Sequence, residues 1–168
     1  MKGKTVKETM ISGHTYRIFP NDLNSKGTVF GGLIMSTIDR LCLVVAERHA
    51  GNTCVTASVD ALHFLAPAGR GDNLIFYVAI NRAWRTSMEI GAKVVAENSV
   101  GELRHIVSAY FTFVALDEFN HPTEIPSLIT ENKVEERRYH EADMRRKHRF
   151  EKKSLIEESR KEGNHEKG

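Results

Sequence analysis

Residues 31–51 read GGLIMSTIDRLCLVVAERHAG and decide the fold of the chain. The stretch contains no proline, and Gly51 is placed as the C-terminal cap of a helix. Its apolar residues occur nearly all round the helix and not along one face only. They are Leu33, Ile34, Met35, Ile38, Leu41, Leu43, Val44 and Val45. We therefore predict one long helix that is central and buried.

Segments with strand-like composition surround this helix along the sequence. One precedes it, and four follow it, separated by turn-like residues. They cover residues 14–19, 54–64, 73–84, 86–97 and 103–116. One strand, one buried helix and a meander of four strands predict an α+β hotdog fold, in which an antiparallel β-sheet wraps around the helix. Because such a sheet leaves an open edge, we expect a second copy to pair with that edge and form a dimer.

The charge is concentrated at the C-terminal end of the chain. Residues 131–168 hold 12 Lys/Arg and 10 Asp/Glu, and residues 1–130 hold 12 of each. The signs alternate at spacings that suit i to i+4 pairs on a solvated helix. We predict a hotdog domain over residues 1–127 and a charged tail, helical or partly disordered, over residues 128–168. The near balance of charge argues against a nucleic-acid-binding arm.

The remaining composition predicts a cytoplasmic protein without a metal or cofactor. No apolar run approaches the roughly 18 residues of a membrane span, and no apolar run follows the basic start as in a signal peptide. Cys42 and Cys54 cannot form a disulfide framework and lack metal-ligand spacing. The eight histidines show no ligand-like pairing. We expect no membrane partner and no metal site.

The segment NSKGTVFGG, residues 24–32, has the composition of a binding turn. Gly31 and Gly32 open the helix, where backbone N–H groups are unpaired and carry the positive end of the helix dipole. Without a Cβ atom, a glycine lets a carbonyl oxygen approach these groups closely. The turn could therefore stabilise the negative charge that a thioester oxygen gains when its carbon is attacked. The competing interpretation is that the glycines only allow the loop to pack tightly on the helix.

Asp39 lies in the middle of the predicted helix, where an unpaired carboxylate would be costly. It either forms an ion pair with Arg40 or Arg48, or faces solvent, or acts in catalysis as a general base or a nucleophile. Gly31 lies eight residues earlier, about 12 Å along the helix axis. One side chain hardly spans that gap. We therefore predict composite sites at a dimer interface, with Asn24 and the glycine turn from one chain and Asp39 from the other.

A combined motif runs from Asn24 to Asp39 and reads N-x-x-G-x-x-F-G-G-x-x-M-x-x-x-D. With TASVDALHFLAP, GD and TSMEI, it resembles the acyl-CoA hydrolase branch of the hotdog thioesterases over about residues 10–120. That branch includes bacterial short- to medium-chain acyl-CoA hydrolases and the brain-type cytosolic acyl-CoA hydrolase of animals. The resemblance implies hydrolysis of fatty acyl-CoA to free fatty acid and CoA, and thus a role in fatty acid metabolism. It also implies that opposite subunits supply Asn24 and Asp39, in a homohexamer built as a trimer of dimers.

The resemblance extends to residues that would bind CoA. Thr86 and Ser87 match a polar pair that lies near bound CoA in relatives. Arg82 and Arg85 lie beside them and are candidates for contacts with the CoA phosphates. The alternative for both arginines is a solvated hairpin end.

Apolar residues near the glycine turn predict an acyl-binding pocket. Phe30, Ile34 and Phe64 are the candidates for its walls. Phe64 and Asp60 also match an aromatic and an aspartate of the family, and Asp60 could be structural.

Other functions lack the motifs that they need. No GxSxG, GxxxxGK[ST] or GxGxxG occurs in the sequence. Two alternatives stay open. One is a hotdog dehydratase or hydratase, which needs a base placed to take a proton from carbon. The other is a non-catalytic acyl-CoA-binding regulator.

Overall fold

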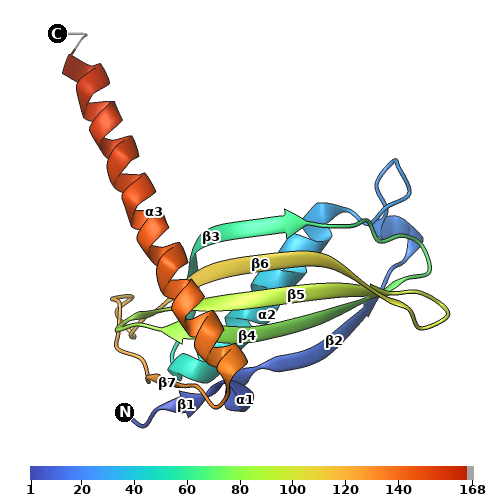
Figure 1. Ribbon diagram of the computed structural model, residues 1–168, viewed down its shortest axis with the longest axis horizontal. Coiled ribbons are helices and arrows are strands. Elements are labelled where there is room, and N and C mark those ends of the chain that lie inside the picture. Colours follow the sequence, from blue (N-terminus) through green and yellow to red (C-terminus); the bar gives the residue numbers. More distant parts are fainter. Residues whose placement is uncertain (166–168) are drawn as a thin grey trace.

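A five-stranded antiparallel sheet with a long helix on each face forms the body of the computed structural model, which describes residues 1–165 (Figure 1). The helices are α1 (Val6–Thr9), α2 (Gly31–Ala50) and α3 (Lys133–His165), with a short 3₁₀ turn at Pro20–Asp22. The strands are β1 (Lys4–Thr5), β2 (Ile11–Arg17), β3 (Cys54–Phe64), β4 (Asn73–Ala83), β5 (Ser87–Glu97), β6 (Leu103–Ala115) and β7 (Leu128–Ile129). No helix within residues 1–165 has the length and apolar character needed to cross a membrane.

The strand order of the main sheet is β2-β4-β5-β6-β3, so β2 and β3 form its two edges. Alternate side chains of the central strands face α2 and are buried, as Leu74, Phe76, Val78 and Ile80 of β4 show. Such alternation buries one face of a sheet and leaves the other for polar contacts. The predicted hotdog fold, an antiparallel sheet around one long helix, is confirmed.

Helix α2 ends where the sequence predicts, at Gly51, which adopts a φ of 72° and donates its N–H to the carbonyl of Glu47. The prediction that α2 is buried all round is wrong for a single chain. Met35 is 42% exposed and Val44 39% exposed, because the sheet covers only one side of the helix. The covered side carries Ile34, Ile38, Cys42 and Val45.

Helix α3 contains nearly all of the charged tail, and its first half is docked on the outer face of the sheet. Arg82 of β4 pairs with Asp143, and Asp60 of β3 pairs with Arg149, so the helix crosses from β4 to the β3 edge. Residues 151–161 of the helix are exposed, and this part projects past β3 (Figure 1). The docked half is less exposed than the sequence predicted, because Arg145 and Arg149 pair with carboxylates of the sheet and Ala142 is fully buried. The domain division at residue 127 stays a prediction.

Candidate active site

Asn24 organises the loop that precedes α2. Its Oδ1 accepts hydrogen bonds from the backbone N–H groups of Lys26 (2.9 Å) and Thr28 (3.3 Å). Its Nδ2 donates to the hydroxyl of Thr28 (2.8 Å). Gly27 has a φ of 75°, a left-handed conformation that favours glycine. Asn24 therefore stabilises a tight turn beside the start of α2.

The two glycines at the start of α2 leave room for aromatic rings. A Cβ atom on Gly31 would lie 3.1 Å from Cζ of Phe64. A Cβ atom on Gly32 would lie 2.3 Å from the Phe30 ring, a distance that atoms in contact do not reach. The glycines therefore do allow close packing, as the competing interpretation states. The role of their N–H groups in binding a carbonyl oxygen stays a prediction.

A pocket of about 420 Å³ opens beside this turn. Its walls are largely apolar, and its volume lies in the range of small-molecule sites. Two of the three predicted acyl-pocket residues, Ile34 and Phe64, line it, whereas Phe30 lies over Gly32. The lining residues are Thr28, Val29, Gly31, Ile34, Phe64, Leu65, Ala66, Pro67 and Ala68. The predicted catalytic turn and an apolar pocket therefore adjoin each other.

Asp39 is half-buried and faces β3. Its Oδ1 accepts a hydrogen bond of 2.7 Å from the hydroxyl of Thr56. Within residues 1–165 it makes no ion pair with Arg40 or Arg48, so that alternative is wrong. The carboxylate is thus held by a neutral donor and keeps acceptor capacity for another group. The sequence analysis did not predict a role for Thr56. The signal that could have identified it is a hydroxyl side chain on the α2-facing side of the strand that follows the helix.

A single chain separates the two halves of the predicted site. Gly31 lies against Phe64 at the end of β3, and Asp39 is bonded to Thr56 near the start of the same strand. Their partners on β6, Phe113 and Val107, are six positions apart, which is roughly 20 Å at about 3.3 Å per residue. The structure therefore does not bring Asn24 and Asp39 of one chain together.

The predicted CoA-binding residues lie near the Asp39 end of the sheet. Ser87 is in register with Val114, which is in register with Val55, the neighbour of Thr56. Arg85 precedes this position, is largely exposed, and has Glu124 at 3.7 Å. The hairpin that carries Arg85, Thr86 and Ser87 thus lies at the same level of the sheet as Thr56.

Arg82 has a different environment from the other three. Its guanidinium pairs with Asp143 of α3 and stacks on the ring of Tyr139 at 3.9 Å. Only 18% of its side chain is exposed. Contact between Arg82 and a CoA phosphate would require this pairing to open.

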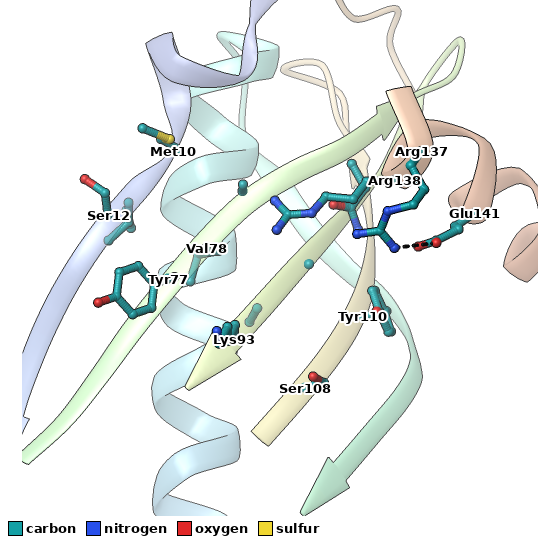
Figure 2. A pocket seen from close by; sticks show the side chains of 15 residues that line it. Met10, Ser12, Tyr77, Val78, Lys93, Ser108, Tyr110, Arg137, Arg138 and Glu141 are labelled. Carbon is teal, nitrogen blue, oxygen red and sulfur yellow. Dashed lines mark hydrogen bonds and ion pairs between the residues drawn. The ribbon is translucent and has the colours of Figure 1, made fainter. Parts of the chain in front are cut away.

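A second pocket, of about 440 Å³, lies on the outer face of the sheet, between β2 and the first turns of α3. Figure 2 shows Tyr77, Lys93 and Tyr110 around it, with Arg137 and Glu141 of α3 joined by a hydrogen bond. The sheet separates this pocket from α2, so it is distinct from the site around Asp39.

Comparisons with known proteins agree with this geometry. The family profile described as thioesterase superfamily matches residues 26–102. The acyl-CoA thioester hydrolase YkhA of Bacillus subtilis, itself uncharacterised, is 37% identical over 122 residues, which cover 72% of this chain and 71% of YkhA.

Two solved structures match nearly the whole chain. A hexameric acyl-CoA thioesterase has a TM-score of 0.88 at 31% identity and covers 92% of this chain and 99% of its own. An acyl-CoA hydrolase of Staphylococcus aureus, solved with butyryl-CoA, CoA and CoA disulfide, has a TM-score of 0.83 at 33% identity and covers 92% and 96%. Variants of that enzyme with alanine in place of an aspartate, an asparagine and a threonine also match. As the motif from Asn24 to Asp39 predicted, the chain belongs to the acyl-CoA thioester hydrolases of the thioesterase superfamily.

Proposed function

We propose that the protein hydrolyses acyl-CoA to a free fatty acid and CoA, at sites shared between two copies of the chain. The spacing of three residues carries this proposal. In the Staphylococcus aureus enzyme the substituted asparagine lies 15 residues before the aspartate, and the threonine 17 residues after it. Asn24, Asp39 and Thr56 have the same spacing here. That enzyme was solved with butyryl-CoA and CoA, the chemical class that we propose as substrate and product.

The edge strand β3 offers the means to join the two halves of the site. Antiparallel pairing of two β3 strands about a two-fold axis near Asp60 would place Thr56 of one copy opposite Phe64 of the other, since both lie four positions from Asp60. Asp39 would then lie beside the glycine turn of the second copy. Val55 and Val59 of β3 are 43% and 47% exposed, and this pairing would cover them.

The site so formed has the groups that thioester hydrolysis needs. The thioester carbonyl would lie against the N–H groups of Gly31 and Gly32, with Asn24 orienting the carbonyl or the water. The ionised carboxylate of Asp39 from the other copy would take a proton from water, whose oxygen attacks the thioester carbon. The carbon–sulfur bond then breaks, and the CoA thiolate leaves and takes up a proton. Direct attack by Asp39 would instead give an anhydride that water hydrolyses.

The rest of the substrate would extend along the interface. Because the 85–87 hairpin lies at the level of Thr56, we propose that Arg85, Thr86 and Ser87 contact CoA, with Arg85 at a phosphate. Arg82 would contact CoA only if its ion pair with Asp143 opened. The apolar pocket beside Phe64 would take the acyl chain.

The proposed assembly is at least a dimer and, by analogy with the hexameric neighbour, a trimer of dimers. The mechanism uses a carboxylate, an amide, backbone N–H groups and water, so we propose that it needs no metal and no cofactor. A cytoplasmic location and a role in fatty acid metabolism stay predictions from the sequence.

The test is release of free thiol from a panel of acyl-CoAs, from acetyl to palmitoyl, by the wild type and by Asp39→Asn. This substitution keeps the shape of the side chain and removes the base, so turnover should fall by roughly two or more orders of magnitude. If Asp39→Asn hydrolysed acyl-CoA at the wild-type rate, Asp39 would not be a catalytic residue. Binding of acyl-CoA without thiol release by the wild type would support the regulator alternative, and hydration of an enoyl-CoA would support the hydratase.

A further inference from the structure

Two adjacent rows of residues cross the sheet at the level of the candidate active site. The inner row, Met88, Phe113 and Thr56, is in register across β5, β6 and β3, and it ends at the threonine that holds Asp39. The outer row, Glu89, Thr112 and Ser58, is the next one along the same strands. Since successive residues of a strand point to opposite faces, Glu89 and Thr112 face α3. On β3 the register shift between Thr56 and Ser58 brings Ser58 to the same face, where Arg149 contacts it.

Helix α3 holds the outer row at its β5 end through Glu89. The carboxylate of Glu89 is 1% exposed and accepts two hydrogen bonds from Arg145, at 3.0 Å from Nε and 2.7 Å from Nη2. Asn81 donates a further one, of 2.9 Å. A buried carboxylate with paired donors from one guanidinium fixes the position of the helix on the sheet.

The β3 end of the outer row is held in the same way through Asp60, whose side chain is 7% exposed. Arg149 of α3 donates to this carboxylate and to the hydroxyl of Thr112, and it lies 3.3 Å from the hydroxyl of Ser58. Thr112 and Ser58 also donate to Asp60, at 2.7 and 2.9 Å. Burial acts to raise the pKa of Asp60, but these hydrogen bonds outweigh it and hold the pKa below its usual value.

The segment of β3 between Thr56 and Ala61 is irregular. Its register with β6 shifts between Thr56 and Ser58, and again between Val59 and Ala61. Bulges of this kind bend a strand and change the direction of its side chains. Within one chain β6 is the strand that pairs with this bulged segment, and Arg149 contacts the segment from the sheet face that α3 covers.

We propose that Arg149 and Asp60 are positioning residues for thioester hydrolysis: the contact of α3 with the bulged segment of β3 sets the position of Thr56, and through it the carboxylate of Asp39. The inference rests on the function proposed above. It gives the charged tail a part in the reaction, although among the described residues no hydrogen bond or ion pair joins α3 to Asp39. Arg149 acts through Asp60, β3 and Thr56.

The experiment compares Arg149→Met and Asp60→Asn with the wild type, as full-length proteins, in steady-state thiol release. Displacements of about 1 Å in a catalytic group can lower rates by up to about 100-fold, so we expect kcat to fall roughly 10- to 100-fold with KM little changed. Arg149→Lys keeps the charge and should recover part of the loss.

A matched control removes an arginine from the same helix without touching β3. Arg137 donates a hydrogen bond of 2.6 Å to Glu141 one turn along α3 and is 62% exposed (Figure 2). Arg137→Met makes the same change of charge as Arg149→Met. Its kcat and its KM should match those of the wild type.

The folded fraction of each variant, followed by circular dichroism at the assay temperature, separates positioning from stability. A loss of kcat no larger than the loss of folded protein would show that Arg149 is only structural. Wild-type kcat in both Arg149→Met and Asp60→Asn would also overturn the proposal, while inactivity of Asp39→Asn would leave the proposed function standing. If the wild type itself released no thiol, the proposed function would fail first.

Discussion

The hydrogen bond from Thr56 to Asp39 can be tested by substituting a single residue. The Thr56 hydroxyl donates a 2.7 Å hydrogen bond to Asp39, and a hydrogen bond to a charged group contributes more than a neutral one. Thr56→Ala should lower kcat about 10- to 100-fold. Thr56→Ser keeps the donor and should retain most of the activity. Steady-state thiol release from one acyl-CoA compares the two, and equal rates for both variants would show that the hydrogen bond is not used.

The site residues that the sequence predicted and those that it did not predict differ in the kind of signal that marks them. Asn24, Asp39 and the glycines lie close together in one motif with unusual composition, so they could be predicted as site residues from the sequence alone. Thr56 has ordinary strand propensity, and only the packing of α2 on β3 reveals its contact with Asp39. Arg82 was predicted to face CoA; its pairing with Asp143 arises from a contact 61 residues along the chain.

The C-terminal end of α2 contains a buried titratable group. His49 is fully buried, and its Nε2 donates to the carbonyl of Pro126 at 2.8 Å. Within residues 1–165 its Nδ1 atom has no hydrogen-bond partner, so a second proton there would be buried and unpaired. Burial lowers the pKa of His49 from its ordinary value of 6.5. The hydrogen bond to Pro126 raises the pKa but offsets only part of this decrease.

This buried histidine predicts how stability depends on pH. Because the folded state binds the proton less readily than the unfolded state, the stabilising contribution is complete above pH 6.5. It decreases as the pH falls below that value towards the lowered pKa of the folded state. The melting temperature of the wild type should therefore drop more between pH 7.5 and 5.5 than that of His49→Gln, which stays neutral. Equal drops in thermal unfolding experiments would exclude His49 as the cause.

At the scale of elements, local patterns predicted α2 and the five strands of the main sheet because their signals are short-range. They placed the first strand at residues 14–19, whereas β2 spans Ile11–Arg17, and they missed the two-residue strands β1 and β7. Alternating apolar residues, a glycine cap and turn residues act within a few positions of each other. The docking of α3 left no such signal, since its i to i+4 charge pattern is also that of a solvated helix. Its partners Glu89 and Asp60 lie on separate strands and become buried only after the sheet has formed.

The whole molecule has surfaces that a single chain leaves uncovered. Met35 and Val44 on α2 and Val55 and Val59 on β3 are each about 40% exposed or more. The sequence predicted a second copy from the open sheet edge and from the distance between Gly31 and Asp39. That distance argument holds in the structure, where Phe64 and Thr56 mark the two ends of β3.

Subunit mixing tests whether the two halves come from different chains. Neither Asn24→Ala nor Asp39→Asn chains should be active alone. In a mixed dimer one site would have both defects and the other would be intact, so random assortment of equal amounts should restore about a quarter of wild-type activity. Mixing Asn24→Ala chains with the double variant Asn24→Ala/Asp39→Asn is the matched control, because no pairing of these chains makes an intact site. If native mass spectrometry confirmed mixed oligomers and thiol release stayed at the level of this control, each site would have to lie within one chain, and β3 pairing would serve assembly alone.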